Sequence, residues 1–173
     1  MLNEINGLPA HILLVHVVVV LVPLVALLGI AGVVWPALRQ RLGILTPLLA
    51  LVSLLFVPVT THAGEWLRDH VPDSPLVAKH AELGDGLLVP AGLLFVLVSA
   101  LWWIDRTNRV ARADRAAAPA VVTATPTRIV VSVLLILTAV FATVQTYRIG
   151  DSGAKAAWQG KVSPTATRHG DGG

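Results

Sequence analysis

The sequence predicts an all-α fold, a four-transmembrane-helix bundle built from two helical hairpins. Hydrophobic residues make up 55% of the chain and charged residues only 13%, and the mean hydropathy is +0.75. A soluble domain is about one quarter charged. Four apolar runs each approach or exceed the length that a helix needs to cross a bilayer core of ~30 Å at ~1.5 Å per residue. The composition and the runs together indicate a multi-pass membrane protein whose first partner is the lipid bilayer.

The four runs predict helices over residues about 12–34, 44–61, 83–104 and 129–147. Aromatic side chains that prefer the headgroup layer lie at or just beyond the ends of these runs, which supports the spans. These side chains are Trp35, Trp66, Trp102, Trp103, Tyr147 and Trp158. The length of 173 residues fits one domain, expected over residues 1–158, and the polar residues 159–173 are expected to form a disordered tail.

Prolines are expected to shape both the helices and one connection. Pro23, Pro58 and Pro90 fall within the first three runs and predict kinks, because proline lacks the N–H that a helix uses. Residues 116–127 are rich in Ala, Pro and Thr and are predicted to be a flexible linker.

The charged residues predict the orientation of the bundle. The connection 35–43 carries Arg39 and Arg41 and no acid, and residues 105–128 carry five arginines against two aspartates. Cytoplasmic loops attract Lys and Arg, so these two connections are expected in the cytoplasm and both termini outside. This orientation accounts for the net charge of +3 without a nucleic-acid partner.

Several kinds of chemistry are excluded or have no motif in this chain. The chain has no cysteine, which excludes disulfides, iron–sulfur clusters, thiolate metal sites and covalently attached c-type haem. It has no His-Glu-x-x-His motif, no phosphate-binding glycine loop after a strand and no nucleophile elbow. We therefore expect no catalytic residues.

Histidines gather at the outer end of the expected bundle and are the candidate site. His11, His16 and His80 are the candidate ligands of a cofactor or metal ion. His11 and His16 lie ~140° apart around one helix, so both cannot point into the bundle. The two halves form a weak repeat in which His11 matches His80 at a shift of 69 residues. This repeat pairs His80 with His11 or His16.

Three interpretations of these histidines stay open. In the first, two of them are the axial ligands of a b-type haem held between helices. In the second, His11, His16, His80 and Glu65 bind a divalent or copper ion. In the third, the histidines only form hydrogen bonds. In the first two, Glu65, Asp85 and His62 are expected to accept or share hydrogen bonds with the ligand rings and fix their tautomers.

Four segments resemble a known family. The sequence Gly-Leu-Pro-Ala-His-Ile-Leu-Leu-Val-His over residues 7–16 resembles the opening of bacterial membrane proteins grouped as domain of unknown function 2231. Residues 63–67, residues 80–85 and residues 150–154 with Trp158 are similar to the rest of that pattern. Ile12 stands where members commonly have proline. The resemblance implies a four-helix inner-membrane protein and implies no established activity.

Two functions therefore follow from the sequence as alternatives. In one, the protein binds a b-type haem or a metal ion through its outer histidines and serves as an electron-transfer subunit beside a redox partner or membrane complex. In the other, it is a non-catalytic structural or accessory membrane subunit without a cofactor.

Overall fold

The computed structural model describes residues 4–5, 7–114 and 125–160, and it confirms the all-α fold. Four long helices carry the apolar runs: α1 (Ala10–Val34), α3 (Leu45–Arg68), α5 (Leu88–Asp114) and α6 (Thr125–Trp158). The short helix α2 (Pro36–Leu42) joins α1 to α3, and α4 (Pro75–Asp85) precedes α5. Two short strands, β1 (Glu4–Ile5) and β2 (Leu8–Pro9), pair antiparallel before α1.

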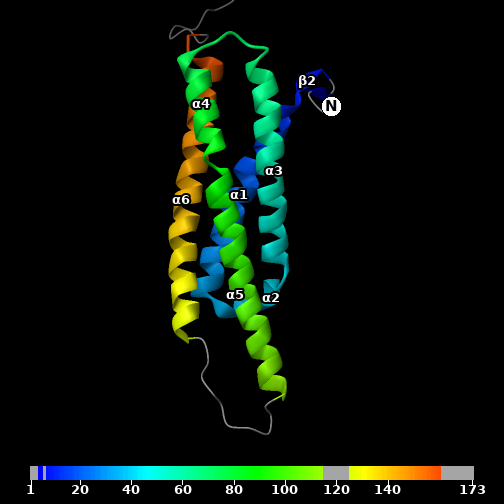
Figure 1. The fold of residues 1–173 in the computed structure, drawn as a ribbon, viewed down its shortest axis with the longest axis vertical. Coiled ribbons are helices and arrows are strands. Elements are labelled where there is room, and N and C mark those ends of the chain that lie inside the picture. The colour runs from blue at the N-terminus through cyan, green and yellow to red at the C-terminus, as the bar shows by residue number, and fades with distance from the viewer. Residues whose placement is uncertain (1–3, 6, 115–124, 161–173) are drawn as a thin grey trace, which may run out of the picture.

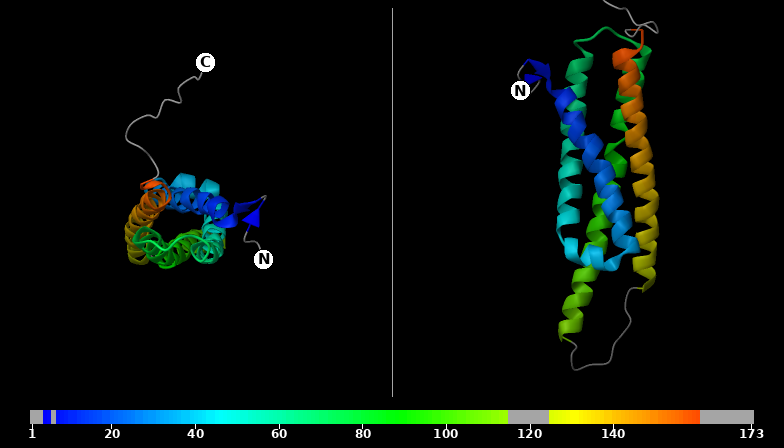
Figure 2. Two further views of the ribbon diagram at one scale, coloured as in Figure 1. Left: turned by 90° about the horizontal axis from the view of Figure 1, so that it is seen from above. Right: turned by 180° about the vertical axis from the view of Figure 1, so that it is seen from behind.

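The long helices form a four-cornered bundle (Figures 1 and 2). α1 packs against α3 and α6, and α5 packs against the same two helices. α1 and α5 therefore occupy opposite corners, as the view along the bundle shows (Figure 2, left). The start of α1, the end of α3, α4 and the end of α6 share one end of the bundle, which we call the histidine end (Figure 1). α2 and the last turns of α5 lie at the other end, the arginine end (Figure 1).

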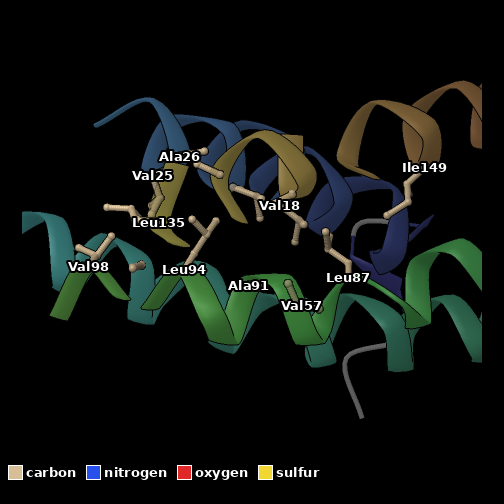
Figure 3. Packing of buried hydrophobic residues seen from close by; sticks show 14 of the residues in the cluster. Val18, Val25, Ala26, Val57, Leu87, Ala91, Leu94, Val98, Leu135 and Ile149 are labelled. Carbon is tan, nitrogen blue, oxygen red and sulfur yellow. The ribbon is translucent and has the colours of Figure 1, made fainter. Parts of the chain in front are cut away.

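The bundle is apolar both inside and outside. Its centre is filled by aliphatic and small side chains, among them Val22, Leu101, Leu135 and Ala139, each no more than 1% exposed (Figure 3). Small residues at helix contacts allow close approach. Large aliphatic side chains such as Leu27 and Leu137 point outward and are more than 60% exposed. Such an aliphatic surface is unfavourable in water. The four candidate spans therefore suit a position in a lipid bilayer.

Three helices run further than their hydropathy predicts, and α5 ends at Asp114 instead of near residue 104. α3 continues past residue 61 to Arg68, and α6 continues past residue 147 to Trp158 as one helix. α6 also begins inside the predicted linker, with Pro126 in its first turn. N–H groups in the first turn have no partner within the helix, so the missing N–H of proline costs no hydrogen bond there. The polar residues at these ends lower the hydropathy but still form helix, so hydropathy alone ends the prediction too early. The rest of the predicted linker, residues 116–124, and residues 161–173 of the predicted tail lie outside the described residues.

The third span is divided instead of kinked. α4 begins with Ser74, whose side chain accepts a hydrogen bond from the Val77 N–H, and it ends at Asp85. α5 starts at Leu88, so Pro90 lies in its first turn and breaks no helical bond there. The Leu83 carbonyl beside the break accepts a hydrogen bond from Gln145 Nε2 at 3.0 Å. The break therefore leaves α4 free to take its own direction at the histidine end.

An ion pair ties the arginine end together. Arg39 on α2 donates from Nε and Nη2 to the two carboxylate oxygens of Asp105 on α5, at 2.7 and 3.2 Å. Its Nη1 donates to the Gly32 carbonyl of α1 at 3.1 Å. Both charged side chains are nearly nine-tenths buried. One guanidinium thus joins three helices.

Candidate two-histidine site

His11 and His80 meet at the histidine end of the bundle. His11 is in the first turn of α1, and His80 is in the middle of α4, which continues into the third span. The centroids of the two rings are 6.0 Å apart, and the ring planes stand at 80° to each other. The two histidines that match in the sequence repeat therefore come together from opposite halves of the chain.

Each ring is anchored through Nδ1 to a backbone carbonyl of a neighbouring helix. His11 Nδ1 lies 2.9 Å from the Thr60 carbonyl of α3. His80 Nδ1 lies 3.1 Å from the Ile149 carbonyl of α6. Because a carbonyl oxygen can only accept, the proton of each neutral ring is on Nδ1. The Nε2 atom of each ring then keeps its lone pair, which is the arrangement of metal-ligating histidines.

Glycines let the rings come this close to α3 and α6. A Cβ atom at Gly64 would lie 2.9 Å from both Cε1 and Nδ1 of His11. A Cβ atom at Gly153 would lie 3.0 Å from Cε1 and 3.2 Å from Nδ1 of His80. A side chain at either position would displace the ring that it faces.

The two anchors have the same design. Gly64 follows Thr60 by four residues, and Gly153 follows Ile149 by four residues, so in each half the carbonyl and the glycine lie one helical turn apart. Each half thus supplies one histidine, one carbonyl and one glycine. This is the structural form of the repeat that the sequence shows only weakly.

One hydroxyl makes the two halves unequal. Ser152 Oγ lies 3.1 Å from His80 Nδ1 and donates to the Ile149 carbonyl at 2.9 Å. The residue before the other glycine is Ala63, which has no polar side chain. The Nδ1 atom of His80 therefore has a second polar neighbour, the Ser152 hydroxyl. Ala63, at the corresponding position beside His11, has no such group.

The other predicted site residues lie elsewhere. His16 is exposed, and its Nδ1 is 2.6 Å from the Ile12 carbonyl of its own helix. His62 Nδ1 is 3.4 Å from Glu65 Oε2, and these two side chains are 83% and 65% exposed. Asp85 is exposed at the last residue of α4. Of the six predicted residues, the structure brings His11 and His80 together at the site and pairs His62 with Glu65 on the exposed surface of α3.

The anchoring atoms were not predicted from the sequence. Thr60 and Ile149 act through their carbonyls, which every residue possesses, so the residue type gives no signal. Gly64 and Gly153 belong to segments that resemble the family, and nothing in that resemblance identifies them as ring contacts. The signal that identifies these contacts occurs twice in the chain: a glycine lies four residues after the residue whose carbonyl binds the histidine. The pairs are Thr60 with Gly64 and Ile149 with Gly153.

Two imidazoles are the metal-ligating set at this place. Within residues 4–5, 7–114 and 125–160, no group of three or more His, Cys, Asp or Glu side chains is placed to hold a metal ion. The four-residue set of His11, His16, His80 and Glu65 is therefore not assembled. The pair offers two nitrogen ligands for one metal centre or two acceptors for hydrogen bonds.

The fold and the site define a multi-pass membrane protein with four spans and a pair of anchored histidines at one end. Residues 7–166 match the model of the family described as predicted membrane protein (DUF2231), and the chain belongs to this family. The chain matches no curated protein and no solved structure.

Proposed function

We propose that His11 and His80 are the axial ligands of one b-type haem and that the protein is an electron-transfer subunit of a bacterial inner membrane. The observation that carries the proposal is the double Nδ1 anchor, at 2.9 Å to Thr60 and 3.1 Å to Ile149. It fixes both rings in the tautomer whose Nε2 is a ligand. A bound haem supplies one-electron chemistry, because its iron changes oxidation state.

The spacing of the rings fits one iron atom between them. Imidazole nitrogens bind transition-metal ions such as zinc at ~2.0–2.1 Å. Two imidazoles on opposite sides of one such ion therefore have ring centroids about 6 Å apart. The His11 and His80 centroids are 6.0 Å apart. The rings come from α1 and from the span that includes α5, which stand at opposite corners (Figure 2).

The number of ligands favours haem over a free metal ion. Zinc sites usually take three or four protein ligands, and other divalent ions take more. The described residues supply two at this place. The iron of a b-type haem needs only axial ligands from the protein, because the macrocycle supplies the others.

The protein's own residues then have defined tasks. Thr60 and Ile149 hold the two tautomers, and Ser152 adds a polar neighbour to the His80 side. Buried aliphatic residues of the bundle core, among them Val18 and Leu87, keep water out of the interior (Figure 3). With one site at one end of a ~30 Å layer, electrons would be exchanged on that side of the membrane only.

The test is the haem content of the full chain purified in mild detergent from cells that overproduce haem. We expect about one haem per chain for the wild type and none for His11→Ala or His80→Ala. His16→Ala is the matched control and should keep its haem, because His16 bonds only to its own helix. A ferric centre that keeps the 80° angle between the ring planes should give the strongly anisotropic low-spin EPR signal of crossed imidazoles.

The competing function is a structural or accessory subunit, and one observation favours it. Each histidine bonds to a carbonyl of another helix, so the pair can act as two interhelical ties without any cofactor. Under this function the wild type contains no haem, and His11→Ala and His80→Ala lower the melting temperature. A wild type free of haem would overturn the haem proposal.

A further inference from the structure

We propose that the arginine end binds the phosphate headgroups of anionic phospholipids. The proposed surface, called the arginine face, consists of Arg41 on α2 and Arg106 and Arg109 on α5, all exposed. It lies at the opposite end of the bundle from His11 and His80 and is independent of the function proposed for them (Figure 1).

The buried ion pair leaves the arginine face with an unbalanced positive charge. Two acidic residues lie toward this end, Asp105 and Asp114, against Arg39, Arg41, Arg106, Arg109 and Arg112, and both oxygens of Asp105 accept from Arg39. The Arg39 charge is thereby neutralised inside the bundle. Among residues 7–110 and 126–160, whose side chains the structure describes, no ion pair involves Arg41, Arg106 or Arg109. Their charge therefore remains available to an anion from outside.

Tryptophans set the depth of the arginine face. Trp35, between α1 and α2, is 63% exposed, and Trp103 on α5 is 60% exposed. Exposed tryptophans at the ends of membrane helices lie in the headgroup layer. The Arg106 guanidinium carbon lies 5.8 Å from the centroid of the Trp102 ring, so this arginine starts from the same layer. The arginines are thus at the depth of lipid phosphates.

The geometry of α5 spreads the charges along that layer. α5 continues past the end of the bundle (Figure 1), and Arg106 and Arg109 are three residues apart on this extension. Residues three apart share a helix face, so both can approach the same headgroup region. Guanidinium groups bind phosphate through paired hydrogen bonds. The chemistry, the depth and the spacing all favour a phosphate that is part of the membrane.

The experiment compares phospholipids that differ only in headgroup charge. The full chain is purified in a neutral detergent, and its melting temperature is measured with added phosphatidylglycerol or phosphatidylcholine of identical acyl chains. We expect phosphatidylglycerol to raise the melting temperature more, and high salt to reduce the difference, because salt screens exposed charges. Arg41→Gln/Arg106→Gln/Arg109→Gln should lose about half or more of this difference.

Controls separate this surface from general charge effects. Arg68→Gln/Arg148→Gln removes two exposed arginines from the histidine end and should keep the wild-type response. If the triple Gln variant is too unstable to measure, the triple Lys variant should keep the preference with a smaller shift, since lysine retains charge without the paired bonds. Soluble glycerol phosphate should give no shift. Equal shifts with both lipids, an equal loss in the control variant, or the full shift with glycerol phosphate would each overturn the proposal.

Discussion

Gly64 and His11 are in contact across α1 and α3, with the ring so near that a Cβ atom on the glycine would come within 2.9 Å of it. The same contact occurs between Gly153 and His80 at 3.0 Å. A side chain at Gly64 or Gly153 would collide with the ring that it faces. The position of each ring therefore depends on the absence of a side chain at the glycine as much as on the hydrogen bond to the carbonyl.

Replacement of Gly153 by Ala should disturb the site, and replacement of Gly150 by Ala should not. Both glycines are in α6, and alanine favours a helix over glycine by up to about 1 kcal/mol. Nothing lies within 4 Å of a Cβ at Gly150, so Gly150→Ala should be neutral or slightly stabilising. At Gly153 the clash with His80 should cancel this gain and cost about 1–3 kcal/mol. Thermal unfolding in one detergent compares the two, and equal effects would contradict the close contact.

Loss of the Asp105 charge should be among the most damaging changes at the arginine end. Asp105→Asn leaves the nearly buried Arg39 without a counter-charge, which typically costs about 3 kcal/mol or more. Glu82→Gln removes one partner of the Lys79–Glu82 pair, whose side chains are 53% and 71% exposed, and should cost less than about 1 kcal/mol.

Arg39→Met/Asp105→Leu extends this comparison. It removes both charges together and should be more stable than Asp105→Asn, because no unpaired charge remains. Free energies of unfolding for the variants provide the measurement. A double variant less stable than Asp105→Asn would mean that the ion pair itself stabilises the fold.

Gln145 should control the junction between α4 and α5. Gln145→Leu leaves the Leu83 carbonyl without its partner beside the helix break, which should cost about 1–3 kcal/mol. Thr143→Val is the control on the same helix, because the Thr143 hydroxyl only donates to its own helix at Ala139 and the side chain is exposed. Amide hydrogen exchange in α4 should rise in Gln145→Leu and stay unchanged in Thr143→Val.

The predicted orientation can be measured with reporters. We expect a reporter after Gly173 to be active outside and a reporter at residue 118 to be active in the cytoplasm, because the arginine-rich connections are retained there. A reporter after Gly173 that is active only in the cytoplasm would reverse the orientation and place His11 and His80 on the inner side.

The four spans were predictable from the sequence because a bilayer demands long apolar helices, and their central boundaries follow hydropathy. The ends of α3, α5 and α6 were not, since Glu65, Arg109 and Lys155 are polar yet still helical. The break before Pro90 depends on Gln145, 55 residues further along, so a local pattern could only indicate a kink.

The candidate site was predictable in part. The shift of 69 residues indicated His11 and His80 as partners, and the structure pairs them. The sequence also offers His16, although its angle of ~140° from His11 opposes a shared inward direction. Glu65, His62 and Asp85 are predicted hydrogen-bond partners because their side chains are polar. In the structure the Thr60 and Ile149 carbonyls accept the hydrogen bonds from the two rings, and no pattern of residue types reveals this.

The division of the anchors between the halves has a consequence for assembly during synthesis. Both ring-bearing segments are synthesised before residue 86, but the carbonyl and the glycine that hold His80 are in α6, the last of the described helices to be synthesised. A chain interrupted before Thr125 possesses both imidazoles and cannot hold the second one in place. Any ligand that requires both rings is therefore held in place only after α6 has been made and has packed against α4.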